Sequence, residues 1–195
     1  MASSSSTDPR PHRRRLILVA GAAALFAVAL VAVLVLRAGG DDDGAPRYRS
    51  ADRAFSVALP AGWRAAGAKE LAAAPSKPAA VLRRADRRGV VVIRRRAPLK
   101  RSSRSLTRDL TAQLGRRFEG LEPVGARSVR LASGPAYVYT FARPSAGTVQ
   151  SIAVAPRRGG TYTIDAVASA GARDAAAQIG AIVRSFDTTD PVPSS

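Results

Sequence analysis

The residues best suited to chemistry in this chain are the cations of one short segment. Between Arg83 and Arg104 there are ten Lys and Arg residues within 22 positions, and Asp86 is the only acid among them. A guanidinium group binds phosphate or carboxylate through two parallel hydrogen bonds, so the segment predicts contact with an anion. The alternative is a solvated strand edge whose arginines deter edge-to-edge pairing. The predicted contact residues are Arg94, Arg95, Arg96, Lys100, Arg101 and Arg104.

The usual catalytic and metal-binding patterns are absent from the sequence. The chain has no cysteine, and its only histidine, His12, precedes the folded region, which excludes thiolate and imidazole chemistry in the domain. No Ser-x-x-Lys or phosphate-loop spacing occurs. Asp165 is the only acid expected in mid-sheet, and we expect it to be solvated or paired with arginine. We therefore expect no catalytic residue, metal or cofactor, and the alternative is a hydrolase with an unrecognised carboxylate site.

One apolar segment predicts where the domain lies. Residues 16–36 are all apolar or glycine, and a helix of that length rises roughly 31 Å, which matches the hydrocarbon core of a bilayer. Arg13, Arg14 and Arg15 precede it, and basic flanks stay in the cytoplasm, which places the N-terminus inside and the domain outside. The segment exceeds the apolar length of a typical signal peptide, so we expect an uncleaved signal anchor, with cleavage as the alternative.

The chain accordingly divides into five predicted parts. These are a disordered basic cytoplasmic tail (1–15), a transmembrane signal-anchor helix (16–36), a Gly/Asp linker (37–46), an extracytoplasmic domain (47–187) and a disordered tail (188–195). The linker spans at most about 33 Å when extended, so the domain stays close to the outer face of the cell membrane.

The domain itself is strongly basic. From Arg47 onward there are 26 Lys and Arg against 10 Asp and Glu, which leaves a net charge of +16. Such an excess needs an anionic partner or a tolerant environment. Nucleic acid is the usual partner of a basic domain, but the predicted topology puts the membrane between them. The remaining candidates are an anionic lipid, an anionic wall polymer and an envelope protein.

Hydrophobic patterning predicts strands and two helices in the domain. Leu106, Leu110, Leu114 and Phe118 recur every four residues and predict a helix that starts at Ser102 or Ser103 and ends at 119–120. A last helix begins at about residue 172, and residues 65–77 are expected to form a loop with one helical turn. The predicted strands are 55–59, 79–84, 89–95, 124–131, 136–142, 148–155 and 161–168.

Short turns rich in Gly and Pro make the last four strands an antiparallel meander. Tyr137, Tyr139 and Phe141 then share one face, which is either covered by a helix or open to a partner. The only tryptophan, Trp63, is expected to fold back onto the core. The predicted fold class is α+β, an antiparallel sheet flanked by helices, preceded by one transmembrane helix.

The order of these elements resembles the PsbP-like fold group, which includes LpqN-like bacterial envelope proteins. The resemblance covers about residues 55–186 and rests on the opening F-S-V-A-L-P-A-G-W, the mid-chain helix, the meander and a last helix that ends I-V-R-S-F. The opening, residues 55–63, is its most specific element. It implies an α/β/α sandwich and proteins that bind other proteins rather than catalyse. We therefore expect a non-catalytic binding domain that docks on a protein or an anionic envelope component. The alternative is a tethered accessory subunit of an envelope protein complex.

Overall fold

The domain is built around a seven-stranded sheet. The structure, a computed structural model, describes residues 46–74, 76–98 and 122–192, together with Asp109, Ala112, Arg116 and Gly120. The strands of the large sheet are β3 (Trp63–Ala65), β4 (Ala80–Arg84), β5 (Gly89–Arg96), β6 (Glu122–Leu131), β7 (Gly134–Arg143), β8 (Thr148–Arg157) and β9 (Gly160–Ser169). Their order is β3-β4-β5-β9-β8-β7-β6, with every neighbouring pair antiparallel. The predicted antiparallel meander is therefore confirmed as β6 to β9.

A second, three-stranded sheet was not expected from the sequence. It has the order β1-β2-β10, from strands β1 (Arg47–Arg49), β2 (Phe55–Ala58) and β10 (Asp187–Thr188). The strand predicted at 55–59 thus exists as β2 but lies outside the large sheet, because β1 and β10, from the two ends of the domain, pair with it. The alternation of apolar and small residues along β2 indicates that one side of the strand is buried. It does not indicate which strands pair with β2.

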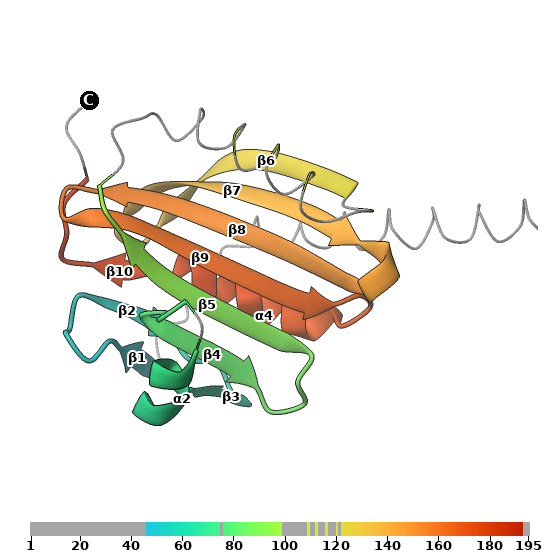
Figure 1. Cartoon of the computed structure of the whole chain (residues 1–195), viewed down its shortest axis with the longest axis horizontal. Coiled ribbons are helices and arrows are strands. Elements are labelled where there is room, and N and C mark those ends of the chain that lie inside the picture. The colour runs from blue at the N-terminus through green and yellow to red at the C-terminus, as the bar shows by residue number, and fades with distance from the viewer. Residues whose placement is uncertain are drawn as a thin grey trace, which may run out of the picture.

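Two α-helices lie among the continuously described ranges, α2 (Ala68–Ala73) and α4 (Arg173–Arg184), together with one short 3-10 helix, η1 (Pro144–Ala146). Helix α4 is the predicted last helix, and Figure 1 shows it lying across one face of the large sheet. Helix α2, six residues long, lies where one helical turn was expected within the loop at 65–77. Asp109, Ala112 and Arg116 are helical and exposed, and the other residues of the helix predicted at 102–119 lie outside the described residues.

The main core lies between α4, the small sheet and the face of the large sheet that α4 covers, which we call the α4 face. Val91, Ile93 and Ile164 point from β5 and β9 into this core and are completely buried. An aromatic group closes one end of it, where the ring centroids of Phe55 and Phe186 are 5.6 Å apart and each lies within 6 Å of Tyr162. Burial of each such side chain contributes about 1.5–3 kcal/mol.

Trp63 closes the other end of the core, as expected. Its indole is 6% exposed and donates a hydrogen bond from Nε1 to Gln178 Oε1 of α4 at 2.8 Å. The ring also lies against the backbone of Gly89, where an added Cβ would come within 2.8 Å of Trp63 Cη2. A glycine at the start of β5 is thus required by close approach of the indole.

The sequence predicted a membrane span before the domain and an end of the domain at residue 187. Among the described residues no helix is long and apolar enough to cross a bilayer, and the span predicted at 16–36 lies outside them. At the other end the chain stays in contact with the sheets through Val192, five residues past the predicted domain end at 187.

Candidate functional site

The predicted contact residues do not form a single surface. Side chains alternate between the two faces of a strand, so Arg95 of β5 lies on the α4 face while Arg94 and Arg96 lie on the opposite face. The remaining three predicted residues, Lys100, Arg101 and Arg104, lie outside the described part of the chain. The contact role of all six stays a prediction.

Arg94 serves partly as a counterion on the opposite face. Its Nη1 lies 3.8 Å from Asp165 Oδ2, and its Nε donates to Ser76 Oγ at 3.2 Å. Asp165 Oδ1 also accepts a hydrogen bond from Gln150 Nε2 at 2.6 Å. Burial raises the pKa of Asp165, an effect that Gln150 and Arg94 partly oppose. The expected arginine pairing of this mid-sheet acid is therefore confirmed.

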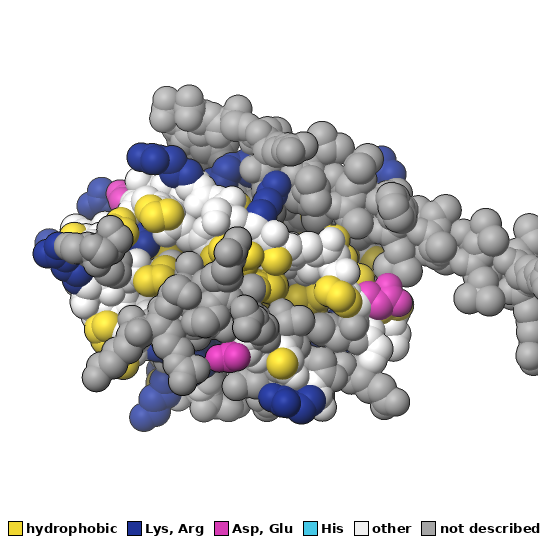
Figure 2. All heavy atoms as spheres, turned by 90° about the horizontal axis from the view of Figure 1, so that it is seen from above, with side chains coloured by type: hydrophobic (Ala, Val, Ile, Leu, Met, Phe, Trp, Pro, Cys, Tyr) yellow, Lys and Arg dark blue, Asp and Glu magenta, His cyan; other side chains and the backbone are white. Residues whose placement is uncertain are grey.

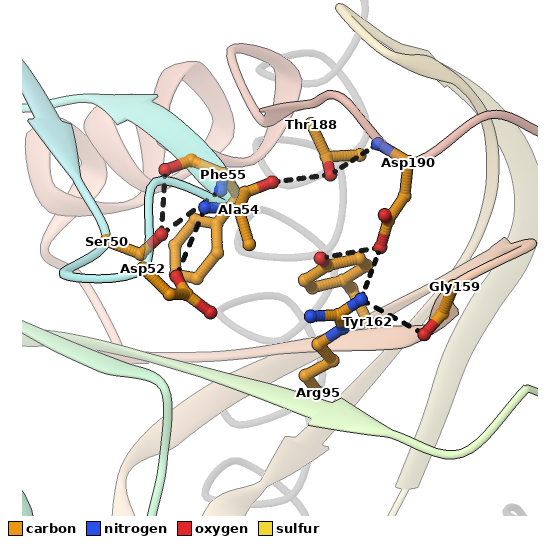
Figure 3. A network of polar contacts seen from close by, with 9 residues as sticks. All are labelled: Ser50, Asp52, Ala54, Phe55, Arg95, Gly159, Tyr162, Thr188 and Asp190. Carbon is orange, nitrogen blue, oxygen red and sulfur yellow. Dashed lines mark hydrogen bonds and ion pairs between the residues drawn. The ribbon is translucent and has the colours of Figure 1, made fainter.

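Arg95 is the centre of a polar network on the α4 face (Figure 3). Its Nη2 donates to Asp190 Oδ2 at 2.9 Å and to the Gly159 carbonyl at 3.1 Å. The guanidinium carbon lies 5.7 Å from the centroid of the Tyr162 ring, in cation–π geometry, and the Tyr162 hydroxyl donates to the same Asp190 oxygen at 3.0 Å. The network joins β5, β9 and the C-terminal tail.

A second arginine adjoins this network and was missed by the sequence reasoning. Arg157, at the end of β8, is 1% exposed, and its Nη1 donates to the carbonyls of Pro135 and Pro156 at 3.1 and 2.7 Å. Burial lowers the pKa of its guanidinium, while the charge of Asp190 opposes that shift. The alternation of side chains along a strand could have predicted this burial, because Arg157 lies on the same face of β8 as the buried positions 153 and 155.

The remaining basic residues divide into paired and unpaired groups. Arg83 pairs with Glu70 at 2.9 Å, and Arg84 contacts both Asp86 and Asp174. By contrast, several exposed arginines form no ion pair with any described acid. These are Arg49, Arg53, Arg87, Arg88, Arg96, Arg130 and Arg173.

The described carboxylates act mainly as internal counterions. Five of them lie in ion pairs with arginine, in the part of the chain that is described: Glu70, Asp86, Asp165, Asp174 and Asp190. No group of three or more His, Cys, Asp or Glu side chains in those residues is placed to hold a metal ion. What the described arrangement offers chemically is positive charge and hydrogen-bond donors.

The aromatic row predicted on one face exists, on the side of the sheet opposite α4. Tyr139, Phe141, Ile152 and Val154 form a buried cluster against which Tyr137 packs. The ring centroids of Tyr137 and Tyr139 are 5.3 Å apart. The sequence allowed either a helix or a partner to cover this face. Most residues of the helix predicted at 102–119 lie outside the described part of the chain, so the question stays open.

Comparison with known proteins identifies the fold. No family model matches the chain, and no curated protein matches it in sequence. Cyanobacterial PsbP (CyanoP) from Synechocystis sp. PCC 6803 superposes with a TM-score of 0.54 and 15% identity, covering 77% of this chain and 97% of that one. The chain has the PsbP-like fold.

Two further solved structures are similar to this chain. A point mutant of Mog1 superposes with a TM-score of 0.52 and 14% identity, over 75% of this chain and 97% of that chain. LpqN of Mycobacterium tuberculosis, described as involved in cell envelope biogenesis, gives a TM-score of 0.49 and 11% identity over 75% of this chain and 87% of that one. At such identities the likeness concerns the fold alone.

Proposed function

We propose that this protein is a membrane-anchored, extracytoplasmic and non-catalytic binding domain that docks on an anionic component of the cell envelope. The signal anchor predicted at 16–36 and the short linker after it support a position near the membrane. The observation that carries the proposal is the set of exposed arginines that form no ion pair with any acid in the described part of the chain. Figure 2 shows Lys and Arg side chains on several parts of the visible surface and few Asp or Glu among them.

Three of these arginines come together at one end of the large sheet. Arg87 and Arg88 form the turn between β4 and β5, and the Arg88 carbonyl accepts a hydrogen bond from Ser169 at the end of β9. Arg173 begins α4, which follows that strand closely. Two described acids near this end, Asp86 and Asp174, both form ion pairs with Arg84. The positive charge of the other arginines therefore stays available for phosphate or carboxylate groups.

Such a patch acts only at short range. At physiological ionic strength the screening length is about 8 Å, so the arginines must nearly touch an anionic surface to bind it. A linker of ten residues permits that approach. Docking on anionic lipid headgroups is the form of the proposal that can be tested most directly.

Co-sedimentation with vesicles tests the proposal. A soluble chain beginning at Pro46 should bind vesicles that contain anionic lipid and should not bind neutral vesicles. Its binding should weaken as the salt concentration rises. Replacing Arg87, Arg88 and Arg173 with Gln should weaken binding without lowering Tm. The control removes the same charge elsewhere, by replacing Arg49 and Arg130 together with Arg53 of the β1–β2 turn.

The outcomes separate the candidate partners. Equal losses in the two triple variants would show that net charge, and not this end of the sheet, sets the affinity. A third variant that replaces Arg94, Arg95 and Arg96 with Gln tests the contact residues predicted from the sequence. Absence of binding at low salt would overturn lipid docking and favour the accessory-subunit alternative, which crosslinking in cells would then examine.

A further inference from the structure

The C-terminal tail, residues 187–192, is held against the domain without apolar burial. It begins directly after the fully buried Phe186, yet none of its own six residues is buried. Its attachment includes two residues paired with β2, a hydrogen bond from Thr188 Oγ1 to the Ala54 carbonyl at 2.6 Å, and the contacts of Asp190 with Arg95 and Tyr162. The Arg158 amide also donates a hydrogen bond to the Pro191 carbonyl at 2.9 Å. Figure 3 shows Asp190 of the tail directed toward Arg95 and Tyr162. An incoming chain could replace each of these polar contacts.

The surface beneath the tail carries more positive charge than the tail neutralises. Asp190 is the one carboxylate in ion-pair contact with Arg95 among the described residues, and Arg157 forms no ion pair with any of them. The Arg157 guanidinium is almost completely buried, and its Nη2 donates to Ser133 Oγ at 3.1 Å. Its buried Nε has no acceptor among the residues that the structure describes. A buried guanidinium without a carboxylate is costly, so a neighbouring negative charge is strongly favoured.

We propose that this end of the α4 face is a binding site for an extended acidic segment of a partner protein, which residues 187–192 occupy in the free chain. The segment would pair with the edge of β2 as β10 does, and a carboxylate three residues after its first paired residue would reach Arg95 and Tyr162. Strand addition supplies affinity through the backbone, and the guanidinium of Arg95, with the buried positive charge of Arg157 adjoining it, selects a carboxylate. This site is separate from the arginines proposed to dock on lipid, so either proposal can fail without the other.

Binding of a tail peptide in trans tests the site. The full chain is ended after Phe186, which removes residues 187–195 and keeps the aromatic core. The probe is a fluorescent peptide with the sequence of residues 187–192, Asp-Thr-Thr-Asp-Pro-Val. The shortened chain should bind it and the intact chain should bind it far more weakly, because a tethered tail competes at an effective concentration in the millimolar range.

Matched peptides test the chemistry of recognition. Asp190→Asn in the peptide should weaken binding about tenfold or more, because hydrogen bonds to a charged group are the strong ones. Asp187→Asn makes the same charge change at an exposed position and should change affinity less than about twofold. Equal affinity of the Asp190→Asn and unmodified peptides would overturn the proposal, as would equal binding of the probe to intact and shortened chains.

A second measurement avoids dependence on the shortened chain. Because the sequence has no cysteine, Val192→Cys gives the intact chain a single labelling site on an exposed residue. Unlabelled peptide at millimolar concentration should lower the fluorescence anisotropy of the labelled tail, and the Asp190→Asn peptide should not. Release that accompanies a doubling of mass would instead assign the site to the tail of a second copy and overturn the partner assignment.

Discussion

Replacing Asp190 with Asn should lower the free energy of unfolding by about 1–3 kcal/mol. Its Oδ2 accepts hydrogen bonds from Arg95 Nη2 at 2.9 Å and from the Tyr162 hydroxyl at 3.0 Å. Hydrogen bonds to a charged group contribute about 1.5–3 kcal/mol each. However, 38% of the Arg95 side chain is exposed, and solvent screening reduces that contact to about 1 kcal/mol or less. Asparagine keeps one acceptor oxygen, so the variant loses the charge and only part of the hydrogen bonding.

Thermal unfolding measures this loss directly. In a domain of this size, 1 kcal/mol corresponds to a change in Tm of about 2–4 °C, so a loss in the middle of the expected range lowers Tm by about 4–8 °C. The control is Asp187→Asn, which makes the same charge change on an exposed residue and should cost less than about 0.5 kcal/mol. Equal shifts in the two variants would show that Asp190 contributes only its formal charge.

A double-mutant cycle isolates the ion pair from the rest of the network. Arg95→Gln combined with Asp190→Asn should destabilise the domain by less than the sum of the two single changes, because each single change already removes the same contact. The expected coupling is about 0.5–1 kcal/mol. Strict additivity would refute a direct contribution of the 2.9 Å contact to stability.

Three further predictions concern stability. Gly89→Ala should cost about 1–3 kcal/mol in denaturant unfolding, because its Cβ would meet Trp63 at 2.8 Å, while Gly125→Ala, with open space around it, should cost less than about 0.5 kcal/mol. Burial raises the pKa of Asp165 above its unfolded value, so ionisation of this carboxyl opposes folding. The free energy of unfolding, measured relative to Asp165→Asn, should therefore fall as pH rises from about 3.9 to the folded pKa. A difference between the two proteins that does not change with pH would contradict this. Gln178→Leu removes the acceptor of the indole N–H, and it should lower stability by about 1 kcal/mol and shift the tryptophan emission, whereas unchanged emission would place the indole elsewhere.

Local patterns were enough to predict much of the large sheet and the last helix. The four meander strands follow from alternation and short turns, which are properties of neighbouring residues. The buried face of α4 follows from apolar spacing, and Ile179, Ile182 and Val183 are buried as expected. The PsbP-like fold, too, could be predicted from the order of these elements. The small sheet could not, because β1 and β10 are two or three residues long and form only by pairing with β2 from opposite ends of the domain.

Which arginines form ion pairs depends on the tertiary structure. Composition alone gave the excess of positive charge and the absence of cysteine and histidine chemistry in the domain. Which arginines are neutralised depends on acids far along the chain: Asp174 is 90 residues from Arg84, and Asp190 is 95 residues from Arg95. Charge content is a sum over residues and can be read from the sequence. Pairing, by contrast, is a matter of distance in space, and only the folded chain brings these groups together.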